Sequence, residues 1–163
     1  MNAPDFGAIY ERYAPDVLRF ATFLTGSRTE AEDITSETFV RAWTSAGAIR
    51  VGTVKAYLFM IARNLHVDRQ RELARRGPFA ADPADPAPRH DTVFDRRDEL
   101  ARVLAALQTL PEIDRAALLM RADEGLAYED IAAALGLTVT AARVKVHRAR
   151  LRLAEIATRQ EES

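Results

Sequence analysis

The chain has 163 residues, a formal net charge of −1 and no cysteine. Disulfides and thiolate metal sites are therefore excluded, and a reducing compartment fits this composition. The first residues lack the basic head and apolar core of a signal peptide, and no apolar run approaches the roughly 20 residues that span a bilayer. We therefore expect a cytoplasmic protein with no membrane insertion.

The small net charge conceals a strong segregation of charge along the chain. Residues 1–49 are net acidic, residues 50–76 are net basic, residues 77–130 are acidic again, and the final stretch is basic. Two basic regions separated by acidic sequence predict two contacts with a polyanion. The acidic surfaces are then left for another partner.

Apolar spacing predicts a first helix from Phe6 to Leu24, with a break or kink at Pro15. Gly26 ends this helix, and a capping box at residues 29–32 starts the next one. The buried side of the second helix is expected to be Ile34, Thr38, Phe39, Ala42 and Trp43. The charged residues Asp33, Glu37 and Arg41 recur every four positions on its outer surface, where a solvated stripe is the ordinary interpretation.

After a loop from Ser45 to Gly52, residues 53–76 predict a helix with two distinct faces. The core stripe is Val54, Leu58, Ile61 and Leu65, and the second, mixed face holds Met60, Arg63, Asn64, Val67 and Arg71. Cations beside an amide and apolar groups suit a single nucleic-acid strand, because cations follow phosphates while amides read exposed base edges. Trp43 and Phe59 could stack on bases, but aromatic residues at helical spacing are more often core.

Residues 77–91 contain four prolines and predict a semi-extended linker. Helical spacing resumes near Val93, with Leu100, Val103, Leu104 and Leu107 expected inside. Pro111 fits the first turn of the following helix, which is expected to end near Gly125 and to bury Ile113, Ala116, Ala117, Leu119 and Met120. The predicted fold is all-α: two small helical domains, residues 1–76 and 93–163, joined by a Pro-rich linker at residues 77–92.

Residues 124–153 have the pattern of a helix-turn-helix, in which Gly136 ends the first helix and Thr138 caps the second. At about 100° per residue the second helix buries Val139, Ala142, Val146, Ala149 and Leu153. Its outward face carries Thr140, Arg143, Val144, His147 and Arg148, with Lys145 and Arg152 beside it, positioned to touch phosphates. This pattern predicts a helix that reads duplex DNA. The alternative is a solvated basic helix at the end of a bundle.

No catalytic arrangement of residues is recognisable. The three histidines, His66, His90 and His147, are scattered, and none has a partner at metal-ligand spacing. Phosphate-binding glycine loops and nucleophile elbows are absent from the sequence. We therefore expect neither enzyme activity nor a cofactor or metal.

Four motifs, in order along the chain, resemble those of bacterial RNA polymerase sigma factors of the extracytoplasmic-function (ECF) group. In the first half they are EAEDITSETFVRAW at residues 30–43, and YLFMIARN at residues 57–64 followed by Asp68 and Arg71. In the second half they are LPEIDR at residues 110–115 and YEDIAAALG at residues 128–136. The resemblance covers almost the full length and implies a subunit that binds core RNA polymerase and promoter DNA.

The resemblance also implies roles for particular surfaces. The helix with Asp33, Glu37 and Arg41 would bind the clamp coiled coil of the polymerase. Residues 45–54 would capture a base flipped out of the −10 element, with Arg63, Asn64, Val67 and Arg71 on single-stranded DNA. The outward face Thr140, Arg143, Val144, His147 and Arg148 would read the −35 duplex, with Lys145 and Arg152 on phosphates. Ala127 replaces the family's Ser/Thr helix cap, a loss of around 1 kcal/mol.

Two other classes of protein fit parts of the same pattern. A stand-alone helix-turn-helix repressor or activator would explain the last helix, but it needs no single-strand-binding helix at residues 50–76. A scaffold protein would leave both basic regions unexplained. We further expect an anti-sigma protein that wraps around or wedges between the two domains, because a long linker would leave them free to be held apart.

Overall fold

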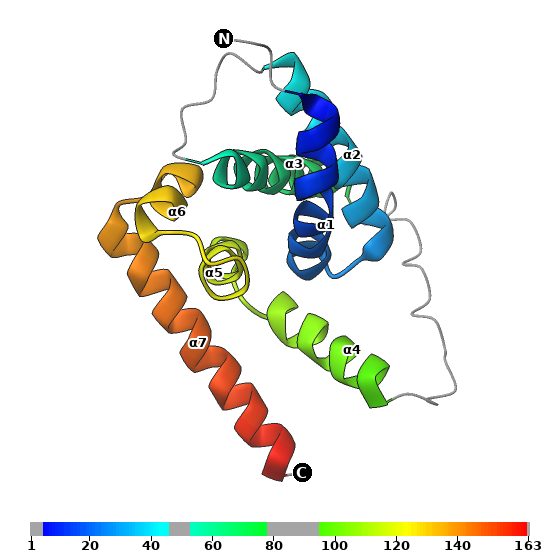
Figure 1. Cartoon of the computed structure of the whole chain (residues 1–163). Coiled ribbons are helices and arrows are strands. Elements are labelled where there is room, and N and C mark those ends of the chain that lie inside the picture. Colours follow the sequence, from blue (N-terminus) through cyan, green and yellow to red (C-terminus); the bar gives the residue numbers. More distant parts are fainter. Residues whose placement is uncertain (1–4, 46–52, 78–94, 163) are drawn as a thin grey trace.

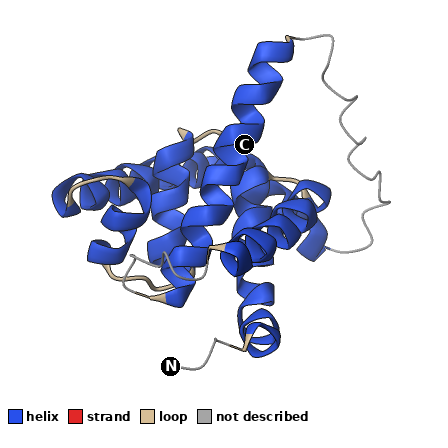
Figure 2. Ribbon diagram, turned by 90° about the horizontal axis from the view of Figure 1, so that it is seen from above, coloured by secondary structure: helices blue, strands red, loops and turns tan. Residues whose placement is uncertain are grey.

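The computed structural model describes residues 5–45, 53–77 and 95–162, and every regular element in these ranges is a helix (Figure 2). The first half forms α1 (Phe6–Thr25), α2 (Arg28–Thr44) and α3 (Val54–Arg76) (Figure 1). The second half forms α4 (Asp95–Gln108), α5 (Glu112–Leu118), the single π-helical turn η3 (Leu119–Asp123), α6 (Tyr128–Leu135) and α7 (Val139–Glu162). The all-α prediction is thus confirmed for the described residues. The predicted loop and linker lie almost entirely outside them. None of the helices described is long and apolar enough to cross a bilayer.

The first two helices differ from the prediction at two positions. Helix α1 runs through Pro15 without interruption, so of the predicted break or kink the break is wrong. Pro15 is exposed, and the carbonyl group that loses its intrahelical partner can therefore be hydrated. Helix α2 begins before the predicted capping box, because the Ser27 side chain accepts a 3.2 Å hydrogen bond from the Glu30 backbone N–H. Helix α1 ends at Gly26, as expected, and this glycine adopts the left-handed region at φ 76°.

Both halves contribute to one continuous hydrophobic core. Helix α1 packs on α2 and α3 in the first half, and α7 packs on α5 and α6 in the second. Contacts of α1 with α4 and η3, and of α3 with α6, join the halves (Figure 1). At the centre of the first half the rings of Phe20 and Phe59 stack, with centroids 4.6 Å apart. Phe59 is therefore a core residue, as predicted.

Three expected core residues are on the surface instead. Trp43 is 67% exposed and stacks on Phe6 of α1, with ring centroids 5.4 Å apart. Leu100 and Val103 are 46% and 48% exposed, whereas Leu107 near the end of α4 is buried. The reason is visible in Figure 1, where only the end of α4 meets the rest of the molecule. The other expected core residues of α2, namely Ile34, Thr38, Phe39 and Ala42, are buried.

The helices of the second half also begin or end at other residues than predicted. Pro111 is the N-cap of α5 rather than a residue of its first turn, and α5 continues into η3 before the chain turns at Gly125. Helix α7 extends to Glu162, whereas the predicted helix-turn-helix ends at Leu153. In this extension Ile156 is half-buried and Arg152 pairs with Glu155 at 3.6 Å, so local contacts continue the helix.

Candidate nucleic-acid interface

The helix-turn-helix has the geometry predicted from its turn residues. Gly136 adopts φ 67° at the end of α6, and its backbone N–H donates to the Ala132 carbonyl. The Thr138 hydroxyl then accepts a 3.0 Å hydrogen bond from the Ala141 N–H and caps α7. Ala127, at the start of α6, offers no side-chain cap. Of the two helices of the motif, α7 therefore begins with a side-chain cap and α6 does not.

The two faces of α7 are separated as predicted. Ala142, Val146 and Ala149 are buried, and Val139 and Leu153 are half-buried against the core. The predicted reading residues, which are Thr140, Arg143, Val144, His147 and Arg148, are all exposed. An exposed face of this composition can approach base edges and phosphates together.

One cation on this face, Arg148, and one beside it, Lys145, are held by a buried acid that sequence reasoning missed. Asp114 of α5 has only 7% of its side chain exposed and lies 3.7 Å from Lys145 Nζ and 3.4 Å from an Arg148 guanidinium nitrogen. The Arg143 guanidinium instead lies 5.2 Å from the centroid of the Tyr128 ring. This is a cation–π contact, and it does not use the N–H groups of Arg143 as hydrogen-bond donors. Arg143 is thus better placed than Arg148 to bind a ligand.

The mixed face of α3 is only partly open. Asn64 and Arg71 are exposed and Val67 is half-buried. Arg63 is turned toward α5, where its Nε and one terminal nitrogen donate to the two carboxylate oxygens of Glu112 at 2.8 and 2.5 Å. The structure therefore brings the four predicted residues to one helix but pairs one of them with the other half of the chain.

The predicted charged stripe of α2 contacts α3 as well as solvent. Glu37 lies 3.2 Å from an Arg41 nitrogen and 3.4 Å from an Arg69 nitrogen, and Asp33 lies 3.9 Å from Arg69. Asp33 and Arg41 are exposed, and Glu37 is half-buried. Glu37 therefore ties α2 to α3 at the surface for which the sequence predicts a polymerase contact.

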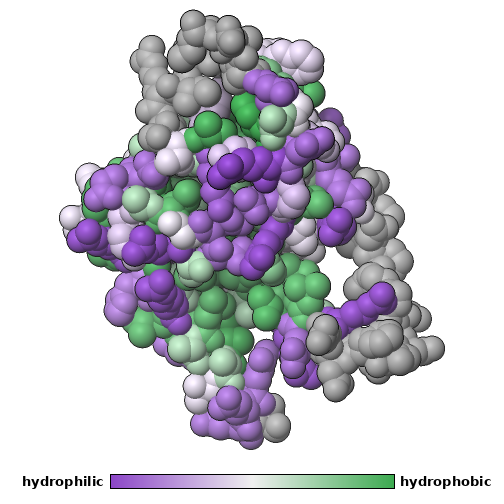
Figure 3. Space-filling view, viewed as in Figure 1, coloured by the Kyte–Doolittle hydropathy of each residue, from purple (hydrophilic) through white to green (hydrophobic). Residues whose placement is uncertain are grey.

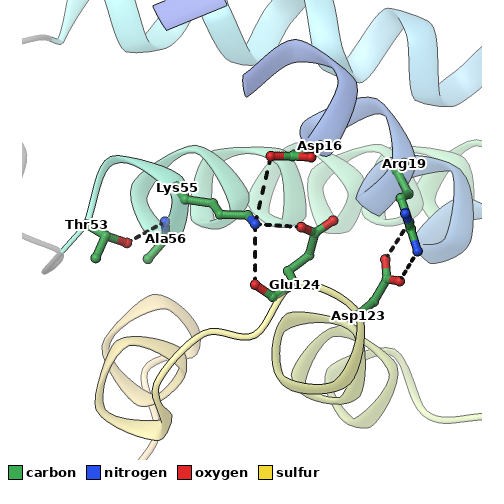
Figure 4. Close-up of polar contacts among 7 residues, drawn as sticks. All are labelled: Asp16, Arg19, Thr53, Lys55, Ala56, Asp123 and Glu124. Carbon is green, nitrogen blue, oxygen red and sulfur yellow. Dashed lines mark hydrogen bonds and ion pairs between the residues drawn. The ribbon is translucent and has the colours of Figure 1, made fainter. Parts of the chain in front are cut away.

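Further ion pairs cross between the two halves (Figure 4). Arg19 of α1 forms a bidentate pair with Asp123, at 2.5 and 3.0 Å. Lys55 of α3 lies 2.8 Å from the Glu124 carboxylate and 3.8 Å from Asp16. Burial raises the pKa of Glu124, while Lys55 acts in the opposite direction. Sequence periodicity gave no signal for these pairs, since their partners come from distant parts of the chain.

Family models match both halves of the chain. Residues 9–76 match Sigma-70 region 2, and residues 100–153 match Sigma-70, region 4. Among curated proteins, the ECF RNA polymerase sigma factor SigL of Mycobacterium tuberculosis is 30% identical over 86% of this chain and 81% of its own length. The chain belongs to the ECF sigma factors. It is therefore a member of a non-enzymatic family.

Other relatives of this sigma factor extend the comparison. SigE of Mycolicibacterium smegmatis is 35% identical over 92% of this chain, but the matched region spans only 60% of SigE. In three dimensions the sigma factor is similar to RpoE of Bartonella quintana, solved in complex with the anti-sigma factor NepR, with a TM-score of 0.76, 29% identity and coverage of 96% of this chain and 98% of that one. It is also similar to CnrH in complex with the cytosolic domain of CnrY, with a TM-score of 0.69, 26% identity and coverage of 94% and 87%.

A hollow in the sigma factor lies beside the α3 face and contains a buried histidine. It has a volume of about 460 Å³ and is lined by residues of α1, α3, α4 and α5, among them Val67, Arg71 and His66. Burial lowers the pKa of His66, and the nearby Arg115 and Arg63 lower it further while Glu112 opposes them. Among the described residues, none forms a hydrogen bond with His66 Nδ1. Within the described ranges, no group of His, Asp and Glu side chains could hold a metal ion.

The sigma factor also exposes apolar surface. Leu100 and Val103 of α4 and Leu151 of α7 are all exposed. Figure 3 shows apolar surface gathered in the lower half of the molecule, over the region where these helices lie. On α7 this surface borders the predicted reading face, because Leu151 lies one helical turn from His147 and Arg148.

Proposed function

We propose that this sigma factor directs core RNA polymerase to promoters by reading two DNA elements with its two halves. The single observation that carries the proposal is the pair of cationic faces on one chain, one on a helix-turn-helix and one on α3. A stand-alone DNA-binding regulator needs only the first of them. The sigma factor would act in the cytoplasm, where polymerase and DNA are.

The C-terminal domain, residues 93–163, would read the −35 duplex. The exposure of Thr140, Arg143, Val144 and His147 along α7 supports this role, since side chains on one helix face can enter the major groove together. Arg148, on the same face, would leave Asp114 to read the duplex with them. Lys145 and Arg152 also carry ion pairs in the free protein and would exchange them for phosphates.

The N-terminal domain, residues 1–76, would hold the −10 element as a single strand. Asn64 and Arg71 are exposed on α3, and Val67 provides apolar surface between them. Arg63 would join them on the strand once it leaves Glu112. Residues 45–54, proposed to capture a flipped base, lie mostly outside the described residues. Asp33, Glu37 and Arg41 of α2 would bind the polymerase clamp.

An anti-sigma factor is a further proposed partner. The solved relative RpoE was determined in complex with the anti-sigma factor NepR, and CnrH was determined in complex with the cytosolic domain of CnrY. The exposed apolar surface at Leu100, Val103 and Leu151 supports a protein partner in addition to DNA. Co-purification of the full chain followed by mass spectrometry would identify it.

The experiment that tests the proposed function is transcription with purified core polymerase. The sigma factor should confer initiation at defined promoters, and core polymerase alone should not. Asp33→Lys should reduce core binding while leaving −35 duplex binding by the free protein intact. Promoter-independent transcription with and without the protein would refute the proposal and favour a stand-alone DNA-binding regulator.

A further inference from the structure

Three acidic side chains, between the start of α5 and the residue that follows η3, contact basic residues of the N-terminal half. Glu112 pairs with Arg63, Asp123 with Arg19, and Glu124 with Lys55. In every pair the acid comes from the second half of the chain and the cation from the first. We call Glu112, Asp123 and Glu124 the acidic face.

The acidic face is partly withdrawn from water, which distinguishes these pairs from ordinary surface ion pairs. The side chains of Glu124, Asp123 and Glu112 are 4%, 18% and 24% exposed. Lys55 also donates a 3.3 Å hydrogen bond to the Glu124 backbone carbonyl, so this cation is held at two points (Figure 4). Partly desolvated charges interact more strongly than exposed ones and are screened less by salt.

Hydrogen bonds to backbone carbonyls reinforce the same contact between the halves. Arg115 is buried and donates to the Leu24 carbonyl at the end of α1, and Gln108 donates a 3.1 Å hydrogen bond to the Phe23 carbonyl. The halves are therefore joined by specific polar contacts as well as by the shared core.

The pair of Arg63 with Glu112 has a direct consequence for DNA binding. Both hydrogen bonds come from one edge of the guanidinium, and this bidentate edge is the part that a phosphate or a base acceptor would bind. A carboxylate and a nucleic acid cannot occupy the same donors together. In the closed arrangement one of the proposed −10 residues is therefore already bound.

We propose that the acidic face is an intramolecular competitor of single-stranded DNA: it docks on the N-terminal domain, occupies Arg63 through Glu112, and holds the free sigma factor in a closed, low-affinity state. Single-strand binding then requires the acidic face to separate from α1 and α3. The inference rests on the proposed function, because it takes Arg63 as a DNA-binding residue.

The first experiment removes one charge from the acidic face of the full-length protein. Glu112→Gln keeps the shape of the side chain but weakens the hold on Arg63. The matched control is Glu129→Gln, at an exposed acid of α6 with the same change of charge. Fluorescence anisotropy with a −10 oligonucleotide, without polymerase, should show about tenfold tighter binding for Glu112→Gln, and Glu129→Gln should bind like the wild type.

The second experiment breaks and restores a pair that lies outside the proposed DNA surface. Asp123→Arg should open the molecule, and Arg19→Asp combined with Asp123→Arg should close it again with the original net charge. Because the chain has no cysteine, spin labels at Ser36→Cys and Ala133→Cys, both exposed, can report the distance between the halves by pulsed electron resonance. We expect a longer and broader distance distribution for Asp123→Arg, and recovery in the double variant.

The possible outcomes separate this inference from the proposed function. Equal oligonucleotide affinity for Glu112→Gln and Glu129→Gln, in a protein that initiates promoter-specific transcription, would overturn the competitor role alone. An unchanged distance distribution in Asp123→Arg would do the same. A protein that never initiates promoter-specific transcription would overturn the proposed function, and the role of Arg63 with it.

Discussion

Arg143 is the residue whose surroundings best suit direct contact with the −35 duplex. It is exposed on α7 beside the Tyr128 ring, and in the part of the chain that the structure describes it forms no ion pair with an acid. We expect Arg143→Ala to weaken duplex binding by about 1–3 kcal/mol, the cost of losing a bidentate base contact. Arg159→Ala, near the far end of the same helix, is the control. Equal losses of duplex affinity in both variants would show that α7 contributes to binding only through its overall positive charge.

His66 makes the stability of the sigma factor depend on pH. Burial lowers its pKa below the ordinary value of 6.5, so the folded protein keeps the imidazole neutral at a pH where the unfolded chain already binds a proton. The free energy of unfolding should therefore fall as the pH decreases through about 6.5, and level off below the folded-state pKa. Urea unfolding at a series of pH values would measure the slope.

His66→Gln provides the control for this pH dependence, since it removes the titrating group. Its free energy of unfolding should vary less than that of the wild type between pH 7 and pH 5. A wild type and variant with parallel pH curves would show that carboxylates, and not His66, set the acid sensitivity.

At the scale of single elements, the uncapped start of α6 is a local weakness. Ala127 has the extended backbone of an N-cap residue, φ −66° and ψ 147°, but no side-chain oxygen. Ala127→Ser should stabilise the protein by about 0.5–1 kcal/mol, because a hydroxyl can accept one of the free N–H groups of the first turn. Thermal unfolding should shift upward by a few degrees, whereas Thr138→Ala, which removes the existing cap of α7, should shift it downward. An unchanged midpoint in Ala127→Ser would show that water already satisfies these groups.

Most of the elements could be predicted from local sequence, because periodicity and turn chemistry act within a few residues. The left-handed glycines Gly26 and Gly136 and the Thr138 cap are examples. The burial of a residue depends on what the fold brings next to it. Trp43 and Leu100 have correct helical spacing, yet no part of the core reaches them.

At the scale of the whole molecule, the contacts between the halves could not be read from the sequence. Arg19 and Asp123 are separated by 104 positions, and Arg63 and Glu112 by 49. The family motifs contain Arg63 and Glu112 but give no sign that they pair. The candidate DNA residues were therefore predictable one by one, while their occupation by the chain's own acids was not.

The same contacts make a prediction about cooperativity. Arg115 is buried and donates to the carbonyls of Leu107 and Leu110 in its own half and of Leu24 in the other. A lysine ammonium cannot reach the three carbonyls that the planar guanidinium binds, so Arg115→Lys would leave buried carbonyls without donors. Each such carbonyl would lower the free energy of unfolding by about 1–3 kcal/mol. The wild type should unfold in one calorimetric transition, because the halves share one core.

In Arg115→Lys the free energy of unfolding should fall by about 2–4 kcal/mol, since more than one carbonyl loses its donor. The van't Hoff enthalpy should also drop below the calorimetric enthalpy as the halves begin to unfold separately. Arg159→Lys, an exposed substitution on α7, should change neither quantity. Two separate transitions in the wild type would show that the halves are thermodynamically independent. That result would also weaken the case for a closed state held by Glu112, Asp123 and Glu124.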